Sequence, residues 1–572
     1  MRRIENIAVW INGRAADERR SRGWNEFGEY VLELLEHRGI AYRVVSTAGA
    51  LLEGGFDVVV AAVADDLHGD ADAMLRFAER GGLVVALANL NRLAARIDHR
   101  PAAPSTRDYA VLRADDGPLG FVAATYGEAG AVRLRYASAA PWRPIGAPAP
   151  GADAFGSLPN GPLLQRFPVG SAGGRLDRFA VNVGETVVAV QQGDRPVLED
   201  GVPAPDGTAD VTDGVLKADD VMLMDWDKDR KTTASGLPYF AFPYADWWRE
   251  LLVGYLVVAC RDRGLALPFV GYWPHGIDRV AHLSHDSDFN GDEQAATTLA
   301  LLEEQGIRST WCMLEPGYSR HLYDRIREGG HEIAFHYNAV AADNGVWSEA
   351  EFLRQFRWLQ EATGERDIAT NKNHLTRVEG WGELFRWCEK AGIASDQTRG
   401  PSKKGNVGFL YGTSHPYFPA AWADENNRRY DVLQVGFLTP DMNTGKWTDD
   451  TFVAPMLDEV ARTEGVAHFL FHQYHLHHNE RVRSAYRIWA EEARARGFTF
   501  LTNREINDWE RARRAFRIGG FGADGAPAVD ALGGPAPAGT VVWVPVVGDA
   551  GAVGDADIAE RYGVPCRRHV LP

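Results

Sequence analysis

The sequence predicts an α/β protein in which a doubly wound α/β domain precedes a distorted (β/α) barrel. At 572 residues the chain is too long for a single hydrophobic core, so two or three domains are expected. Strand and helix patterns alternate over the first hundred residues and alternate again from Arg279 onward. Apolar residues make up 45% and charged residues 24%, which is ordinary for a globular protein.

The first hundred residues have the pattern of a doubly wound sheet. Helices are predicted at Trp24–Arg38 and Asp70–Arg80, and buried strands at Ile7–Trp10, Tyr42–Val45, Phe56–Ala62 and Leu83–Ala88. The strand Phe56–Ala62, the helix that ends in Gly81-Gly82 and the strand that follows it resemble a pattern of the type-1 glutamine amidotransferase-like fold. Glutaminase chemistry needs a cysteine nucleophile, but the first cysteine is Cys260. We therefore expect a scaffold, regulatory or ligand-binding role for this domain.

The regular alternation of strand and helix patterns stops over residues 107–227. Short β-type runs such as Phe179–Val183 and Thr186–Val190 are broken by Gly, Pro and Asp, which predicts a β-rich insertion. Tyr244–Arg263 then reads as a long amphipathic helix that closes the N-terminal domain. The resulting domains are 1–270, a barrel at 271–518, and a Gly/Ala/Pro-rich segment with a short β appendage at 519–572, where Thr540–Val547 is a predicted strand.

Composition excludes several classes of partner. A net charge of −17 argues against nucleic acid, because phosphate binding needs a concentrated basic face. The ten-residue apolar run Leu251–Cys260 is too short to cross a bilayer, and no apolar run follows the first arginines as in a signal peptide. Four dispersed cysteines without a CxxC pair indicate a reducing compartment. We expect a cytoplasmic protein whose partner is a small-molecule or oligosaccharide substrate.

The C-terminal half has the alternation of a (β/α) barrel. Helices are predicted at Asp292–Gln305, Arg320–Gly329, Ser348–Thr363, Glu379–Ala391, Thr451–Arg462 and Asn479–Arg496. Strands are predicted at Arg279–His285, Ile307–Leu314, His331–Phe335, Asp367–Thr370, Asp431–Phe437, Val466–Phe471 and Thr499–Leu501. Seven strands with helical crossovers indicate a barrel.

Polar residues follow several of these strands directly. They are Asp286 and Asp288 after the first strand, His336 at the end of the third, Asn373 and His374 after the fourth, and His472 and His475 after the sixth. The C-terminal ends of barrel strands share one face, so these side chains should converge. Carboxylate and imidazole without thiolate is the donor set of a divalent-metal hydrolase, with zinc the best fit. A carboxylate base and an imidazolium acid would complete amide hydrolysis.

Three short motifs in the C-terminal half resemble those of a known enzyme family. LSHDSD at 283–288, GGHEIAFH at 329–336 and FLFH at 469–472 resemble the motifs of polysaccharide deacetylases, carbohydrate esterase family 4. The resemblance covers about Arg279 to Arg513. It implies that Asp286 is the general base, that Asp288 and His336 bind the metal, and that His472 is the acid. It also implies removal of an acyl group, N-acetyl above all, from a carbohydrate or related amide.

One position departs from the family pattern. A second metal histidine is expected four residues after His336, but Val340 stands there. Either the site is degraded or another residue substitutes. A divergent branch of the family combines an H-D-x-D first motif with an N/R-x-H element after the fourth strand, and the stretch ending in His374 resembles that element. His374 is therefore the candidate third ligand. The downstream stretch GFLYGTSHPYFP at Gly408–Pro419 resembles the same branch, which makes His415 a candidate pocket residue beside Asn373 and His475.

Two other interpretations remain beside the hydrolase. The stretch from Asp286 to Gly291 matches the opening of a calcium-binding EF-hand loop, but Thr297 occupies the twelfth position, where a bidentate Glu is needed. The missing histidine favours a catalytically inactive carbohydrate-binding or scaffolding protein that retains the barrel. The Asp pair, His336 and His472 favour an enzyme, which acts on a sugar or on a non-sugar amide.

Overall fold

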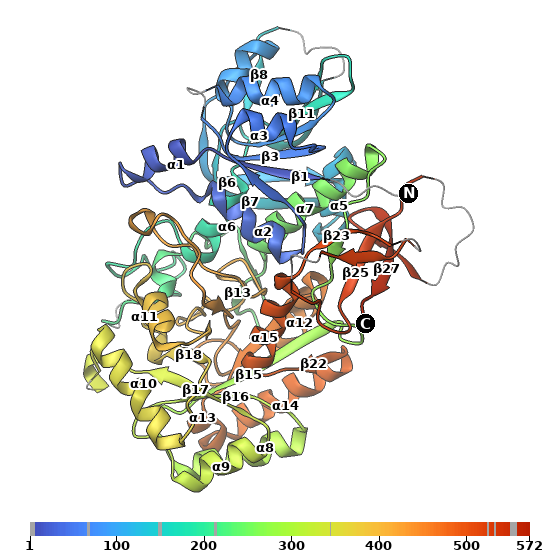
Figure 1. The fold of residues 1–572 in the computed structure, drawn as a ribbon. Coiled ribbons are helices and arrows are strands. Elements are labelled where there is room, and N and C mark those ends of the chain that lie inside the picture. Colours follow the sequence, from blue (N-terminus) through green and yellow to red (C-terminus); the bar gives the residue numbers. More distant parts are fainter. Residues whose placement is uncertain are drawn as a thin grey trace.

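The computed structural model describes residues 6–65, 69–146, 152–210, 214–343, 345–522, 525–530, 534–548 and 557–572. It confirms the predicted fold class: an N-terminal mixed sheet with helices lies above a C-terminal parallel barrel (Figure 1). Parts of the predicted Gly/Ala/Pro-rich segment, at 523–524 and 531–533, lie outside the described residues. Among the described residues, no helix combines the length and the apolarity needed to cross a bilayer.

The N-terminal sheet has nine strands, and its order defines a place where a ligand can bind. The order is β2 (Arg43–Val45), β1 (Ile7–Ile11), β3 (Val58–Val63), β4 (Leu83–Leu87), β11 (Gly174–Phe179), β10 (Gly161–Val169), β9 (Asp153–Leu158), β6 (Ser105–Arg113) and β7 (Ala131–Ala139). The first five are parallel and the last four pair antiparallel. Because β2 lies on one side of β1 and β3 on the other, the topology reverses between β1 and β3.

Both faces of this sheet are covered, as doubly wound topology requires. Val58 and Val60 of β3 pack in the core with α2 (Val31–His37) and α7 (Tyr244–Asp262). Val59 and Ala61 face the opposite core with α3 (Ala48–Glu53) and α4 (Asp70–Glu79). The alternation explains why the strand is apolar throughout. The strands within 107–179 extend this same sheet.

One predicted strand is a helix. Thr186–Val190 lies inside α6 (Val183–Gln192), and Phe179–Val183 straddles the end of β11 and the start of that helix. The Asn182 side chain accepts a hydrogen bond from the Glu185 amide and caps the helix. The correction has a physical reason: an N-cap and burial on almost every side outweigh the β propensity of a Val-rich run.

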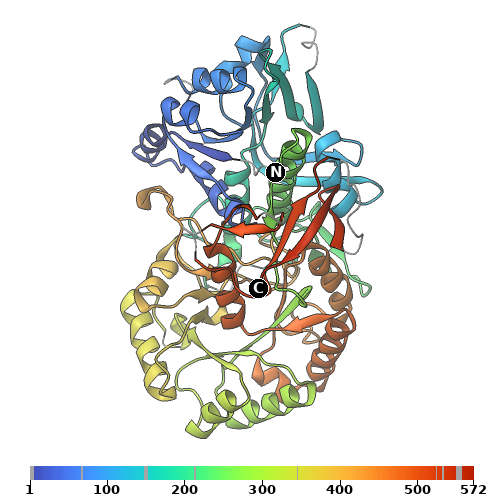
Figure 2. The same cartoon turned by 45° about the vertical axis from the view of Figure 1, so that its right-hand side comes forward.

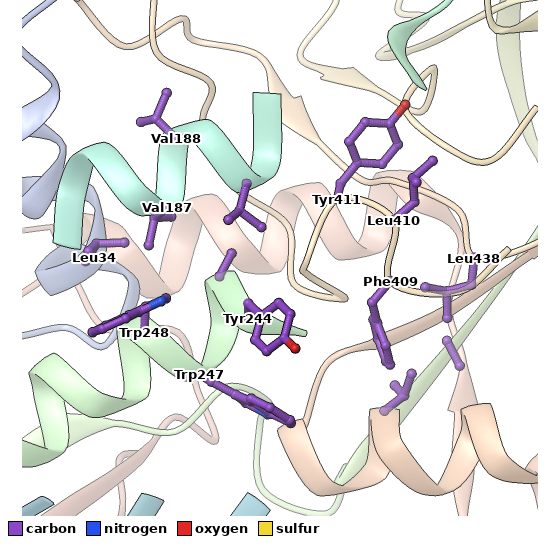
Figure 3. Close-up of a cluster of buried hydrophobic side chains, with 14 of the residues drawn as sticks. Leu34, Val187, Val188, Tyr244, Trp247, Trp248, Phe409, Leu410, Tyr411 and Leu438 are labelled. Atoms are coloured by element: carbon purple, nitrogen blue, oxygen red, sulfur yellow. The ribbon is translucent and has the colours of Figure 1, made fainter. Parts of the chain in front are cut away.

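The two halves share one continuous apolar core. Trp247 and Trp248 of α7 lie close to Val187 of α6, and Phe409 and Leu410 approach from loops of the barrel (Figure 3). All five belong to a single cluster of buried side chains. The predicted helix at the end of the N-terminal domain is confirmed, and it packs against both halves.

The barrel consists of eight parallel strands. They are β15 (Arg279–Asp286), β16 (Thr310–Met313), β17 (Glu332–Tyr337), β18 (Thr370–Asn373), β19 (Ser395–Asp396), β20 (Leu433–Gln434), β21 (Val466–Leu470) and β22 (Phe498–Phe500). The order is β20-β19-β18-β17-β16-β15-β21, and β22 pairs with the beginning of β15. A parallel bridge between Thr439 and Phe469 connects the stretch after β20 to β21. The distorted barrel is confirmed. The two-residue β19 was not predicted.

Helices ring the barrel, and three of them begin at a residue whose side chain caps the helix. The helices are α8 (Asp292–Gln305), α9 (Arg320–Glu328), α10 (Glu349–Thr363), α11 (Glu383–Ala391), α12 (Val453–Thr463), α13 (Gln473–His478), α14 (Glu480–Ala495) and α15 (Asn503–Ala515). Ser348 caps α10, and Thr502 with Glu505 forms a capping box on α15. Figure 2 shows these helices around the parallel strands.

The C-terminal residues form a small antiparallel sheet at the side of the molecule. Its strands are β25 (Val541–Pro545), β27 (Val564–Val570) and β26 (Ile558–Arg561), joined by β14 (Phe269–Val270) from the linker between the two halves. The predicted terminal strand Thr540–Val547 corresponds to β25. The predicted boundary near residue 270 therefore lies inside a strand that pairs with the C-terminal segment.

A connecting segment, residues 193–243, runs from α6 to α7 along the barrel. Val197 bridges Gly380, and Lys217 bridges Arg377, so the segment pairs with the loop that follows β18. The Asp219 carboxylate accepts hydrogen bonds from the Ser402 amide at 3.1 Å and from Asn406 Nδ2 at 2.8 Å. These contacts fix the segment to loops at the carboxyl end of the barrel.

Candidate functional site

Two carboxylates follow the central strand of the barrel. Asp286 is the last residue of β15 and is buried, and Asp288 lies two residues further on in the loop. Phe289 and Asn290 lead from there into α8, with Asn290 at a φ of +49°. The turn directs both carboxylates toward the space above the barrel. The predicted convergence begins with this pair.

Two imidazoles meet Asp288 from neighbouring strands. His336 comes from β17, and its Nε2 lies 3.2 Å from Oδ1 of Asp288. His374 directly follows β18, and its Nδ1 lies 3.3 Å from the same oxygen. Donor atoms of the three residues all lie within 4.8 Å of one another. Val340, four residues after His336, is a buried loop residue that offers no donor side chain.

The backbone after His374 is held in an unusual conformation. Leu375 and Thr376 have φ values of +51° and +53°, in the left-handed region that disfavours residues with a Cβ. Such strain persists only where surrounding structure imposes it, and it is concentrated at functional sites. The two residues redirect the chain directly after β18 and leave His374 at the cluster.

The donor chemistry of this trio fits a divalent cation. His336 Nδ1 lies 2.9 Å from the Lys372 carbonyl oxygen, which only accepts hydrogen bonds, so Nδ1 carries a proton. In the neutral ring Nε2 then points a lone pair at the Asp288 carboxylate. Two electron-rich atoms in contact are stable only with a proton or a cation between them. Imidazole nitrogen and carboxylate oxygen are ligands typical of zinc and similar ions.

His472 is fixed by a carboxylate that the sequence did not predict. It follows β21, its amide donates to Asp441 Oδ1 at 2.8 Å, and its Nδ1 donates to the second oxygen of the same side chain. Its Nε2 lies 3.5 Å from Oδ2 of Asp288 and 3.9 Å from Oδ2 of Asp286. Burial disfavours the charged ring, but the surrounding carboxylates, Asp441 first, outweigh it and raise the pKa of His472 to about 9.

Lys372 stands behind Asp286. It belongs to β18, is fully buried, and its Nζ lies 3.2 Å from Oδ2 of Asp286. Burial alone would raise the pKa of the Asp286 carboxyl, but the Lys372 charge and the two imidazoles of His336 and His472 lower it. Asp286 is therefore ionised at neutral pH.

A cavity of about 220 Å³ opens over these groups. Asp286, Asp288 and His472 form its polar base, and Trp447 lies along one wall with its ring nearly parallel to that of His472, at 6.3 Å between centroids. Phe289 and Leu375 are exposed at its edge. The remaining lining includes His475, Tyr474, Lys446 and, from the connecting segment, Lys217.

Of the three candidate pocket residues, only His475 lines this cavity. Asn373 instead donates from Nδ2 to the Arg377 carbonyl oxygen at 2.8 Å, and so braces the turn that carries His374. His415 lies at the amino end of the strands, where its Nε2 approaches the Thr463 carbonyl oxygen at 2.7 Å. It was placed in the pocket by a resemblance in the surrounding stretch, but that loop passes beneath the barrel to meet the N-terminal half.

Several residues at the site were not predicted, among them Asp441, Lys372, Trp447 and Lys217. Lys372 belongs to β18, but the predicted strand ended at Thr370, so nothing marked this lysine as buried. Asp441 and Trp447 lie in a long irregular stretch after β20, where no periodic pattern marks their direction. Lys217 belongs to the N-terminal half, and only the docking of the connecting segment brings it to the cavity.

Comparisons with known proteins give distant structural similarity. No family model matches the chain, and no curated protein matches its sequence. A putative polysaccharide deacetylase from Mycobacterium smegmatis is 15% identical, with 43% of this chain and 94% of that chain covered and a TM-score of 0.32.

Two further solved structures are similar at the same level. A putative polysaccharide deacetylase involved in O-antigen biosynthesis from Bordetella bronchiseptica is 16% identical, with 38% and 90% covered and a TM-score of 0.26. A CE4 family pseudoenzyme from Bacillus anthracis is 10% identical, with 41% and 66% covered and a TM-score of 0.24. At this distance the function has to be argued from the residues of the site. The resemblance of the N-terminal half to amidotransferase-like domains stays a prediction.

Proposed function

We propose that the protein is a metal-dependent hydrolase that removes an acyl group, N-acetyl above all, from a carbohydrate or a related amide. Asp288, His336 and His374 hold a divalent ion, zinc being the best match to the donor set. Asp286 is the general base and His472 the general acid. The observation that carries the proposal is the convergence of His336 Nε2 and His374 Nδ1 on one oxygen of Asp288, at 3.2 and 3.3 Å.

A second group of donors, Asp286, Asp288 and His472, also lies within mutual reach. It is the weaker candidate for the ion, because His472 Nδ1 is held by Asp441 and nearby carboxylates favour the protonated ring. A metal ligand has to be deprotonated. In the first group Nδ1 of His336 lies against the Lys372 carbonyl oxygen, so Nε2 is the ring atom turned toward the ion, and Asp286 and His472 remain for proton transfer.

The residues of the chain divide the proton transfers between them. When bound, the ion supplies Lewis acidity, which polarises an acyl oxygen and acidifies water. Asp286, ionised beside Lys372, accepts the proton of the attacking water. His472 presents Nε2–H toward the cavity because Asp441 fixes Nδ1, and it donates to the leaving amine. Trp447 shields the acid from bulk water on one face.

The test combines metal content with acyl release. Elemental analysis of the purified protein should find close to one divalent ion per chain, and acetate should be released from N-acetylated sugars. Asp288→Ala should lose both ion and activity. His374→Ala should lose the ion if it replaces the usual second histidine, whereas His475→Ala, at the same cavity, should retain it.

A catalytically inactive protein that only retains the barrel would give a different set of results. It would show little metal in the wild-type protein and no acetate release from any N-acetylated sugar when the protein is supplied with zinc, cobalt or nickel. Retention of full metal occupancy by His374→Ala would instead remove that residue from the ligand set and leave it as a pocket residue.

A further inference from the structure

A second polar site lies in the N-terminal half, and it shares no lining residue with the barrel cavity. Two adjoining cavities of about 590 and 510 Å³ follow the carboxyl edge of the nine-stranded sheet. Five residues line both of them: Arg19, Glu26, Ser138, Asn182 and Glu185. The two cavities therefore form one elongated crevice.

The position of the crevice is the one that an open α/β sheet offers to ligands. Its walls come from residues 19–27, which follow β1, residues 62–65 at the end of β3, and residues 87–92 at the end of β4. The topology reverses between β1 and β3, and ligands of such sheets bind outside the carboxyl ends of the strands at that reversal. The crevice occupies this point.

Backbone strain marks the same place. Ala88 and Leu90, directly after β4, both have a φ of +57°, although neither is glycine. The Ala88 amide donates to the Phe179 carbonyl oxygen at 2.8 Å, which holds the turn in place. Strain of this kind costs free energy and is found mostly where a binding surface has to be shaped. Both residues line the crevice.

The crevice contains charges of both signs, and some of them are paired. Arg19 forms an ion pair with Glu26, and Arg107 forms one with Asp194. The carboxylate of Glu185 accepts a hydrogen bond from Ser138 at 3.1 Å. Asp65 and Arg92 also line the crevice, so charges of both signs are interspersed along it. Neither sign is concentrated, and the charge pattern therefore favours a neutral ligand.

The remaining side chains suit a ligand rich in hydroxyl groups. Amides and hydroxyls both donate and accept hydrogen bonds, and the lining supplies Asn89, Asn91, Asn182 and Ser138. Trp24 lines the second cavity and is 59% exposed. An exposed indole beside amides and carboxylates offers an apolar plane to the C–H face of a sugar ring together with polar groups for its hydroxyls.

We propose that this crevice binds a neutral carbohydrate, with Trp24 stacking on a sugar ring and Glu185 and Ser138 accepting and donating at its hydroxyl groups. The site is separate from the hydrolase proposed for the barrel and goes beyond it. None of the four cysteines is among its described lining residues, so the crevice lacks the nucleophile of glutaminase chemistry.

Calorimetric titration of the full-length protein tests the proposal. The probes are cellotetraose, xylotetraose, mannotetraose and N-acetylchitotetraose at millimolar concentration, with a chelator present so that hydrolysis does not contribute. At least one probe should bind saturably. Trp24→Ala should weaken that binding about tenfold, because a stacking aromatic is lost from an exposed position where the fold does not depend on it.

Two further variants make the result specific. Glu185→Gln should weaken the same binding several-fold, and Phe289→Ala, at the edge of the barrel cavity, should leave it unchanged. Binding that survives Trp24→Ala and is lost in Phe289→Ala belongs to the barrel and overturns the proposal, as does the absence of binding by every probe. Neither outcome bears on whether the barrel holds a metal, so the two proposals fail separately.

Discussion

The barrel carries a buried cluster of charged residues at each of its two ends, and the two clusters differ in how their charges are matched. At the amino end of the strands, Glu510 of α15 accepts hydrogen bonds from the guanidinium groups of both Arg513 and Arg514. Arg514 also donates to Glu33 at 2.7 Å, and Arg513 donates to the His37 carbonyl oxygen at 2.6 Å. Every one of these contacts joins a donor to an acceptor, and those to Glu33 and His37 connect the two halves.

At the carboxyl end the contacts are of another kind. The ring nitrogens of His336 and His374 converge on a single oxygen of Asp288, and the neutral form of His336 presents a lone pair to it. Side chains of the amino-end cluster are almost completely buried, whereas Asp288 and His472 at the carboxyl end are partly exposed. The mismatch of donors and acceptors, more than burial of charge, is the ground on which an ion is proposed at the carboxyl end.

The largest expected effect of a substitution in the carboxyl-end cluster is on turnover. Asp286→Asn keeps the shape of the side chain but removes the base, so turnover should fall by about 10²–10⁴-fold. Metal content and the midpoint of urea unfolding should be close to those of the wild type. Acetate release measured beside both quantities is the check. A variant that unfolds early would show that Asp286 serves the fold as the amino-end cluster does.

The amino-end cluster should respond in the opposite way. Glu510→Ala leaves two buried guanidinium groups without their carboxylate, and the free energy of unfolding should fall by about 3–5 kcal/mol. Turnover per folded molecule should be retained. Glu480→Ala is the matched control, because its ion pair with Arg483 is exposed and the change should stay within about 0.5 kcal/mol. An equally small loss for Glu510→Ala would contradict the structural role assigned to that cluster.

A third variant tests the carboxylate that holds His472 at the carboxyl end. Asp441→Asn should reduce kcat/KM by about 10–100-fold, as is usual when the partner that orients a functional histidine is lost. The carboxylate also raises the pKa of His472 to about 9, so its removal lowers that pKa and moves the alkaline limb of the pH profile to lower pH. A purely structural role would reduce activity without moving the limb.

The smallest effect concerns pH and the amino end. Burial first, and then nearby arginines, hold the pKa of His37 and of His415 well below the usual value, so both rings are neutral in the folded protein. In the unfolded chain they take up protons below about pH 6.5, so stability present above that pH is lost as the pH falls. Each contributes a slope of up to about 1.4 kcal/mol per pH unit. His415→Gln should reduce the slope of unfolding free energy between pH 7 and 5, and an unchanged slope would contradict a neutral ring.

Much of the candidate site follows from strand ends alone. Asp286, His336 and His472 were predicted to converge because parallel barrel strands deliver their last residues to one face. The position of His374 was also predicted, because it directly follows a recognisable strand. The roles of these residues stay predictions until metal content and turnover are measured.

The unpredicted part has a physical cause. Asp441 does not directly follow β20 but lies in the irregular stretch beyond it, and its contact with His472 places it. The Val-rich stretch of α6 was predicted as strand because local propensity cannot include the burial imposed by the neighbouring half. His415 was assigned by a resemblance in the surrounding stretch and so lacked the support of a strand end. Local sequence pattern predicts the site residues that directly follow strands, whereas residues in irregular stretches are placed by tertiary contacts.

The path of the connecting segment has a consequence for how this architecture can be inherited. Lys217 lines the barrel cavity although it precedes the first barrel strand by some sixty residues, and Leu216 accepts a hydrogen bond from the Val378 amide at 3.0 Å. A gene fragment encoding only 271–518 would therefore specify a cavity with one wall missing. Recombination that exchanged the N-terminal half would alter the barrel cavity as well, so the two halves should have diverged as a single evolutionary unit.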